Sequence, residues 1–163
     1  MTSISTCLWF DGKAEEAARF YVSVLPNSRI DAVLPYTVET PGGKPGDVMV
    51  VEFTVAGQSC IALNGGPYQT FTPAMSLFIT VDSQEEIDQL WEALTEGGAP
   101  VQCGWLTDRY GVSWQIAPRQ LMEMLRDPDT DRVVRVTQAM LGMVKLDLPT
   151  LIAAYEGKGP VAG

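Results

Sequence analysis

Hydrophobic and polar residues follow the order strand, helix, strand, strand, strand along the first part of the chain. Strands show alternating apolar positions, and the helix shows apolar residues at intervals of three and four. The elements expected are a strand at 4–10, a helix at 14–25 and strands at 29–36, 48–55 and 58–63. Pro26 ends the helix, and a glycine- and proline-rich loop at 41–46 separates two of the strands. This first module occupies about 1–66.

The same order begins again after residues 65–67, in a second module at about 74–118. The elements expected are a strand at 75–81, a helix from 83 to 97 and strands at 101–107 and 112–117. Ser83 and Glu86 fit a capping box, which marks the start of this helix. Gly97 is placed to end it in a left-handed conformation.

Beyond Pro118 the pattern becomes helical, with helices expected at 121–125, 131–144 and 149–156. About forty residues are too few for a core of their own. The segment at about 119–157 is therefore expected to be an appendage that packs on the second module or on a partner subunit. The whole chain, 1–163, is expected to form one domain.

Side chains alternate across a strand, so each strand divides into two faces. One set is uniformly apolar and is expected to lie under the helices: Cys7, Trp9, Val51, Phe53, Val55, Leu77, Ile79, Val81, Val112, Trp114 and Ile116. The opposite set is mixed: Thr6, Leu8, Phe10, Val50, Glu52, Thr54, Ser76, Phe78, Thr80, Ser113, Gln115 and Ala117. The mixed set is typical of a small-ligand pocket, although a solvent-exposed sheet face has a similar composition. Glu52, a lone carboxylate, favours the pocket.

Charge and composition limit the kinds of partner and the compartment that are expected for the protein. Eleven Lys and Arg against twenty Asp and Glu give a net charge of −9, which repels nucleic acids and anionic lipid surfaces. No run approaches the roughly 20 apolar residues of a membrane-spanning helix. Three scattered cysteines are typical of a reducing compartment, so a cytoplasmic protein is expected. The chain has no histidine, which excludes imidazole as a base or a metal ligand.

Three runs of residues, at 10–17, 62–67 and 103–115, resemble the PhnB-like branch of the glyoxalase and bleomycin-resistance (vicinal oxygen chelate) superfamily. The resemblance extends over about 6–154. It implies an α+β fold in which two tandem βαβββ modules form a cupped sheet around a small-molecule pocket, here with a C-terminal helical appendage. It also implies a homodimer, for which methionines 122, 124, 140 and 143 supply adaptable apolar surface.

Metal-binding relatives in this superfamily take one ligand from each of four strands, and the matching positions here are Thr6, Glu52, Ser76 and Gln115. Only Glu52 is a strong ligand, so no bound metal and no other cofactor is expected. Members of the branch often carry the label 3-demethylubiquinone methyltransferase. The glycine-rich turn of a usual S-adenosylmethionine-dependent methyltransferase is absent, and the loop at 42–46 is expected to be a flexible hairpin loop.

Glu52 is the catalytic candidate, as a general base, unless it is a former metal ligand held by hydrogen bonds. Arg109 either clamps a ligand carboxylate or pairs with a surface acid. The remaining candidates orient a ligand or border the pocket. The expected ligand-binding residues are Thr6, Ser76, Gln115, Trp105, Arg109 and Tyr110.

Three functions are consistent with this pattern. The first is a metal-free module that binds a small, partly apolar molecule of unknown identity. The alternative is a metal-independent isomerase or lyase that uses Glu52 for proton transfer. The third is a structural or interaction protein, which a filled cup would favour. Ligand-induced stabilisation and turnover distinguish these functions.

Overall fold

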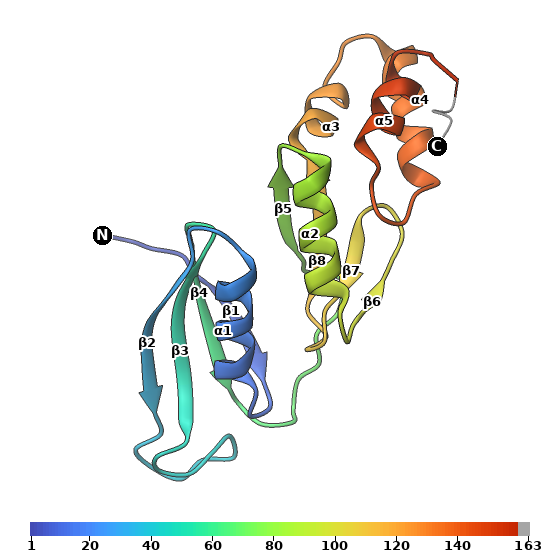
Figure 1. The fold of residues 1–163 in the computed structure, drawn as a ribbon. Coiled ribbons are helices and arrows are strands. Elements are labelled where there is room, and N and C mark those ends of the chain that lie inside the picture. The colour runs from blue at the N-terminus through green and yellow to red at the C-terminus, as the bar shows by residue number, and fades with distance from the viewer. Residues whose placement is uncertain (160–163) are drawn as a thin grey trace. The chain divides into compact units, whose positions relative to one another are not determined.

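The computed structural model describes residues 1–159, so the last four residues of the expected 1–163 domain lie outside it. The chain divides into two compact units, one from Met1 to Phe71 and the other from Thr72 onward. Each unit has its own four-stranded sheet (Figure 1). The expected α+β fold with two βαβββ modules is confirmed. That the chain forms one domain stays a prediction.

Unit 1 contains the first module. Its elements are β1 (Thr6–Phe10), α1 (Ala14–Val24), β2 (Arg29–Pro35), β3 (Val48–Val55) and β4 (Gln58–Asn64). The strands lie in the order β1-β4-β3-β2, with β1 parallel to β4 and the other pairs antiparallel. A tight turn at Ala56 and Gly57, with φ values of 48° and 84°, joins β3 to β4 and fixes their register.

Helix α1 covers one face of this sheet. Small alanines at 14, 17 and 18 let the helix approach closely, and all three are fully buried. Tyr21, also fully buried, stacks on Phe53 of β3 with ring centroids 6.4 Å apart. The helix therefore defines a covered face, and the opposite face of the sheet has no helix of unit 1 on it (Figure 1).

Asn64, at the end of β4, ties the start of α1 to the sheet. Its Oδ1 accepts a hydrogen bond from the backbone N–H of Ala14 at 2.9 Å, and its Nδ2 donates to the carbonyl of Val48 at 2.9 Å. The hydroxyl of Tyr36 donates to the carbonyl of Asn64. Gly42 and Gly43 pack on Tyr36, because an added Cβ at Gly42 would lie 2.3 Å from its hydroxyl.

Unit 2 contains the second module, with β5 (Leu77–Val81), α2 (Gln84–Thr95), β6 (Ala99–Pro100), β7 (Trp105–Thr107) and β8 (Ser113–Pro118) in the sheet order β5-β8-β7-β6. The capping box of Ser83 and Glu86 is confirmed, as is the left-handed Gly97, whose φ is 74°. The single strand expected at 101–107 is wrong. Cys103 and Gly104 have φ values of 59° and 80°, which end the extended conformation between β6 and β7.

The C-terminal helices are α3 (Arg119–Met124), α4 (Thr130–Leu141) and α5 (Leu148–Tyr155). They pack on the second module, one of the two locations expected. Their apolar cluster includes the end of β8: Ala117, Leu121, Met124, Val136, Leu146 and Leu151. Gln84 of α2 joins the two parts, because its Oε1 accepts from the N–H of Leu148 at 2.7 Å and its Nε2 donates to the carbonyl of Leu146 at 3.1 Å.

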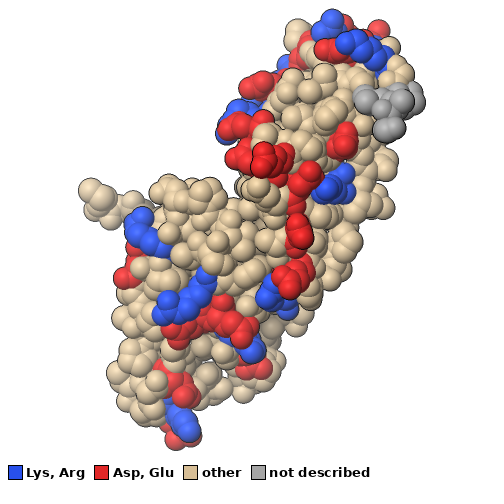
Figure 2. All heavy atoms as spheres, viewed as in Figure 1, with Lys and Arg blue, Asp and Glu red and all other residues tan. Residues whose placement is uncertain are grey.

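Charge is unevenly distributed on unit 2. Figure 2 shows acidic side chains gathered over α2, which contains no basic residue. The exposed acids on or beside this helix are Asp82, Glu85, Glu86, Asp88, Glu92 and Glu96. In residues 1–159, no helix has the length and apolar character needed to cross a bilayer.

Candidate functional site

The open face of unit 1 is the sheet face opposite α1. Strand register places side chains in two rows across all four strands. One row is Cys7, Ile61, Glu52 and Ala32, and the next is Trp9, Leu63, Val50 and Leu34. Residues in register lie on the same face of a sheet, so these eight side chains form one surface. Seven of them are uncharged and one, Glu52, is a carboxylate.

The face expected for β1 is wrong. Leu8 and Phe10 were expected on the mixed face, but they are 7% and 4% exposed and lie on the side covered by α1. The register explains this, because Leu8 is opposite Ala62, which in turn is opposite the fully buried Val51.

Thr6 therefore lies on the opposite face of the sheet from Glu52. Its hydroxyl accepts a hydrogen bond from Nε2 of Gln58 at 2.9 Å. Cys7 takes the place on the open face that was expected for Thr6, in the same row as Glu52. Sequence reasoning missed this exposed cysteine.

Glu52 lies on the open face of unit 1, as expected. Its side chain is exposed and forms no hydrogen bond or ion pair with any residue in 1–159. Ile61 and Ala32 flank it on the neighbouring strands. Cys7 lies beyond Ile61, and partial desolvation raises the pKa of its thiol. Glu52 is therefore the charged group of this surface.

Trp9 lies on the open face, not in the core as its place in the apolar set predicted. Its Nε1 donates to the carbonyl of Gly66 at 2.8 Å. Its ring lies against Gly65, where an added Cβ would be 2.2 Å from Cζ2 of the indole. The run at 62–67 that carries the family resemblance therefore positions Trp9 as well as α1.

The open face of unit 2 is opposite α2. Register places Phe78, Gln115 and Trp105 in one row across β5, β8 and β7. Nε2 of Gln115 donates to the hydroxyl of Ser76 at 2.9 Å, and Phe78 is 47% exposed. The structure thus brings together three of the expected ligand-binding residues, Ser76, Gln115 and Trp105. The faces expected for β5 and β8 are confirmed, and Trp114 is buried on the opposite side.

Arg109 and Tyr110 belong to the turn between β7 and β8. The guanidinium of Arg109 contacts Glu96 at the end of α2, with Nη2 3.3 Å from Oε2 and Nε donating to the Glu96 carbonyl at 3.2 Å. Of the two roles expected for Arg109, pairing with a surface acid is the one that the contacts support. Tyr110 is half-buried, and its backbone N–H donates to Asp108.

Asp108 has a structural role that the sequence analysis did not predict. Its side chain is 2% exposed, and its Oδ2 accepts from Nε1 of Trp114 at 2.8 Å. Its Oδ1 accepts from the N–H groups of Tyr110 and Val112 at 2.8 and 3.0 Å. The signal was present in the sequence, since a tryptophan six residues after a turn aspartate supplies an N–H that needs a buried acceptor.

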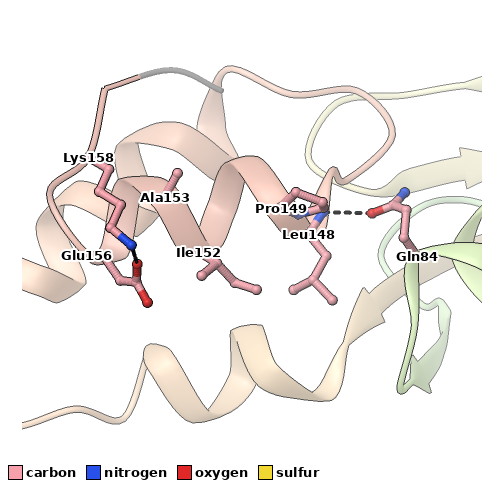
Figure 3. Close-up of a pocket in the computed structure, with 7 residues that line it drawn as sticks. All are labelled: Gln84, Leu148, Pro149, Ile152, Ala153, Glu156 and Lys158. Carbon is pink, nitrogen blue, oxygen red and sulfur yellow. Dashed lines mark hydrogen bonds and ion pairs between the residues drawn. The ribbon is translucent and has the colours of Figure 1, made fainter. Parts of the chain in front are cut away.

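A cavity of about 430 Å³ lies elsewhere in unit 2, against α5 (Figure 3). Its lining is mostly apolar: Gln84, Leu148, Pro149, Ile152, Ala153, Glu156 and Lys158. Gln84 bonds to Leu148 and Leu146, and Lys158 pairs with Glu156. None of the expected site residues lines this cavity.

Comparison with known proteins identifies the family to which this chain belongs. A family described as 3-demethylubiquinone-9 3-methyltransferase matches residues 2–117. A putative 3-demethylubiquinone-9 3-methyltransferase, PhnB protein, from Bacillus cereus is 38% identical, with a TM-score of 0.65 over 72% of this chain and 99% of that one. The chain belongs to the PhnB-like branch of the glyoxalase superfamily.

Two further solved structures share the architecture. Protein PA1353 from Pseudomonas aeruginosa is 26% identical, with a TM-score of 0.61 over 72% of this chain and 98% of that one. The fosfomycin resistance protein FosX from Listeria monocytogenes shares the fold at 14% identity, with a TM-score of 0.54 over 77% and 98% of the two chains. No curated protein matches the chain.

The family match ends at residue 117, whereas the resemblance was expected to reach about 154. The three helices α3, α4 and α5 therefore lie outside the PhnB-like match. They are a C-terminal addition to the two modules, joined to them through Gln84 and the end of β8.

Proposed function

We propose that this PhnB-like protein binds a small, partly apolar molecule on the open faces of its sheets and holds no transition metal there. One observation carries the proposal: each unit has a sheet face without a covering helix, mostly apolar, with few polar groups. Glu52 is the charged group of the two apolar rows in unit 1, and the bonded pair Gln115 and Ser76 supplies polar groups in unit 2. Such surfaces are typical of ligand sites.

The donor set does not suit a transition metal. The chain has no histidine, and Thr6 lies on the opposite face from Glu52. Cys7 and Glu52 are two possible ligating side chains on the open face of unit 1, fewer than the three or four protein ligands that zinc takes. In residues 1–159 no group of three His, Cys, Asp or Glu residues could hold an ion. Elemental analysis after dialysis tests this, and one equivalent of metal lost in Glu52→Ala would refute it.

The first module lacks the usual cofactor site of the methyltransferase named in the family description. A usual S-adenosylmethionine site opens a helix after the first strand with a glycine-rich turn. Here β1 is followed by residues 11–13, Asp-Gly-Lys, and the start of α1 is held by Asn64 instead.

The proposal includes a cytoplasmic homodimer, in which a second copy protects the exposed apolar residues. Several large apolar side chains outside the two open faces are exposed in the described chain, among them Val33, Val134, Leu141 and Val144. Contact with a second copy would remove this surface from water. Light scattering at micromolar concentration is expected to give twice the mass of the chain, and a monomeric mass would contradict the dimer.

A second candidate function is a metal-independent isomerase or lyase that uses Glu52 to accept a proton. The absence of any partner for Glu52 within residues 1–159 favours it, because an unpartnered carboxylate is free to act as a base. A panel of metabolites is first screened for stabilisation of the protein against heat. Each hit is then tested for turnover with wild type and with Glu52→Gln. Binding without turnover supports the binding protein, and turnover lost in Glu52→Gln supports the enzyme.

A further inference from the structure

The open face of unit 1 carries one unpaired negative charge within an apolar surface. Glu52 is on β3, an inner strand of the sheet, and its row contains Cys7, Ile61 and Ala32. The next row, from Trp9 to Leu34, is also uncharged. Any molecule that covers the two rows therefore covers the carboxylate as well.

The two charged groups of β2, Arg29 and Asp31, neutralise each other. Arg29 is in register with Thr54, two residues along β3 from Glu52. Its Nε donates to Oδ1 of Asp31 at 2.7 Å, and the hydroxyl of Thr54 donates to Oδ2 of the same carboxylate at 2.7 Å. Arg29 is thus paired with Asp31 and is not a counter-ion of Glu52.

Covering an unpaired carboxylate is costly, because the charge loses its hydration and gains nothing in return. A ligand that brings its own positive charge avoids this penalty and gains a charge-assisted hydrogen bond. The protein's net charge of −9 also attracts cations from solution.

We propose that the open face of unit 1 binds a small organic cation with an apolar body, such as a primary amine, and that Glu52 is its counter-ion. The inference rests on the proposed function, since it names the class of ligand that the binding surface takes. The apolar body lies on Ile61, Leu63 and Val50, and the ammonium group donates to the carboxylate.

Cys7 provides a chemical probe of this charge, because its thiol is exposed in the same row. Two strand spacings separate the backbones of Cys7 and Glu52, or about 10 Å. The thiolate attacks a methanethiosulfonate, forming a mixed disulfide and releasing methanesulfinate. The reagents are cationic 2-aminoethyl and anionic 2-sulfonatoethyl methanethiosulfonate, used at about 0.01 M salt, where the Debye length is about 30 Å.

The rate ratio of cationic to anionic reagent at Cys7 is expected to fall about fourfold in Glu52→Gln, the effect of one unit charge on two opposite charges about 10 Å away in water. Peptide mass spectrometry separates Cys7 from the buried Cys60 and half-buried Cys103. Glu39→Gln, which removes another exposed carboxylate from the loop before β3, is the matched control and is expected to leave the ratio within twofold.

Binding is measured by calorimetry with three probes of one shape: 4-phenylbutylamine, 4-phenylbutan-1-ol and 4-phenylbutanoate. The amine is expected to bind at least fivefold more tightly than the alcohol, and the carboxylate more weakly. In Glu52→Gln the amine falls to the level of the alcohol, whose affinity is unchanged. Glu39→Gln keeps the wild-type order.

The results of these experiments distinguish failure of the cation inference from failure of the proposed binding function. Equal affinity for amine and alcohol in the wild type overturns the cation inference and leaves the binding function intact. A Cys7 that reacts readily while none of the three probes binds counts against the binding function itself. A native protein in which Cys7 does not react has its open face covered by protein, which overturns both.

Discussion

Gly65→Ala is the substitution whose effect follows most directly from the structure. The added Cβ would lie 2.2 Å from Cζ2 and 2.3 Å from Cε2 of Trp9, whereas ordinary carbon contacts are about 3.5–4.0 Å. Trp9 must therefore move by more than 1 Å, roughly the difference between these distances. The movement breaks the 2.8 Å hydrogen bond from Nε1 to the carbonyl of Gly66.

The expected cost combines overpacking, about 1–3 kcal/mol, with a lost hydrogen bond of about 1 kcal/mol. The free energy of unfolding, measured in urea, is therefore expected to fall by roughly 2–4 kcal/mol. Gly142→Ala is the control, because its added Cβ would have no neighbour closer than 3.6 Å and its φ is −86°. It is expected to change stability by less than about 0.5 kcal/mol.

A double-mutant cycle isolates the contact. In a Trp9→Leu background the indole is absent, so Gly65→Ala is expected to cost less than about 1 kcal/mol, with a coupling energy above 1 kcal/mol. If Gly65→Ala costs as much without the indole as with it, the contact with Trp9 is not the cause. If Gly65→Ala is as stable as wild type, the placement of Trp9 against Gly65 is refuted.

Three further substitutions test other parts of the structure by urea unfolding. Asp108→Asn places an amide NH2 against either the indole N–H of Trp114 or the backbone N–H groups of Tyr110 and Val112, and we expect a loss of about 1–3 kcal/mol; an unchanged stability would contradict the buried acceptor. Glu52→Ala removes an exposed, unpartnered group and is expected to cost less than about 0.5 kcal/mol, while a loss above 1 kcal/mol would indicate a structural role. The hydrogen bond from Tyr155 lowers the pKa of Asp127 in the folded protein. The ionised carboxylate therefore stabilises the fold fully above the unfolded pKa of about 3.9, and this stabilisation is lost as the pH falls through the folded pKa. The stability difference between wild type and Tyr155→Phe should therefore be present at pH 7 and narrow below about pH 4, and a difference that does not vary with pH would exclude this linkage.

The order of elements could be predicted because its signals are local. Helical spacing, the capping box of Ser83 and Glu86 and the left-handed Gly97 each depend on a few neighbouring residues. The prediction of one strand at 101–107 was wrong because of a local backbone conformation that the residue types do not indicate. Cys103 adopts a positive φ, which is uncommon for a residue with a Cβ, and its apolar neighbours resemble a continuous strand.

The face of β1 could not be predicted from alternation, because both of its faces are apolar. Cys7 and Trp9 are as hydrophobic as Leu8 and Phe10, so the pattern within this strand does not identify the side under α1. The register between β1 and β4 determines which face of β1 lies under α1. This register depends on a residue more than fifty positions away, since Leu8 is opposite Ala62. Non-local pairing of this kind leaves no signal in a short window.

The residues that identify the family mostly hold the fold. Asn64 fixes α1, Gly65 and Gly66 position Trp9, and Asp108 holds the buried indole of Trp114. Cys7, Glu52 and Ile61, which make up most of one row of the open face of unit 1, lie outside the three runs that carry the resemblance. Substitution on such a surface changes the ligand without changing the fold. The similarity to PhnB-like proteins therefore establishes the architecture, and the ligand must be inferred from the charge and apolar surface around Glu52.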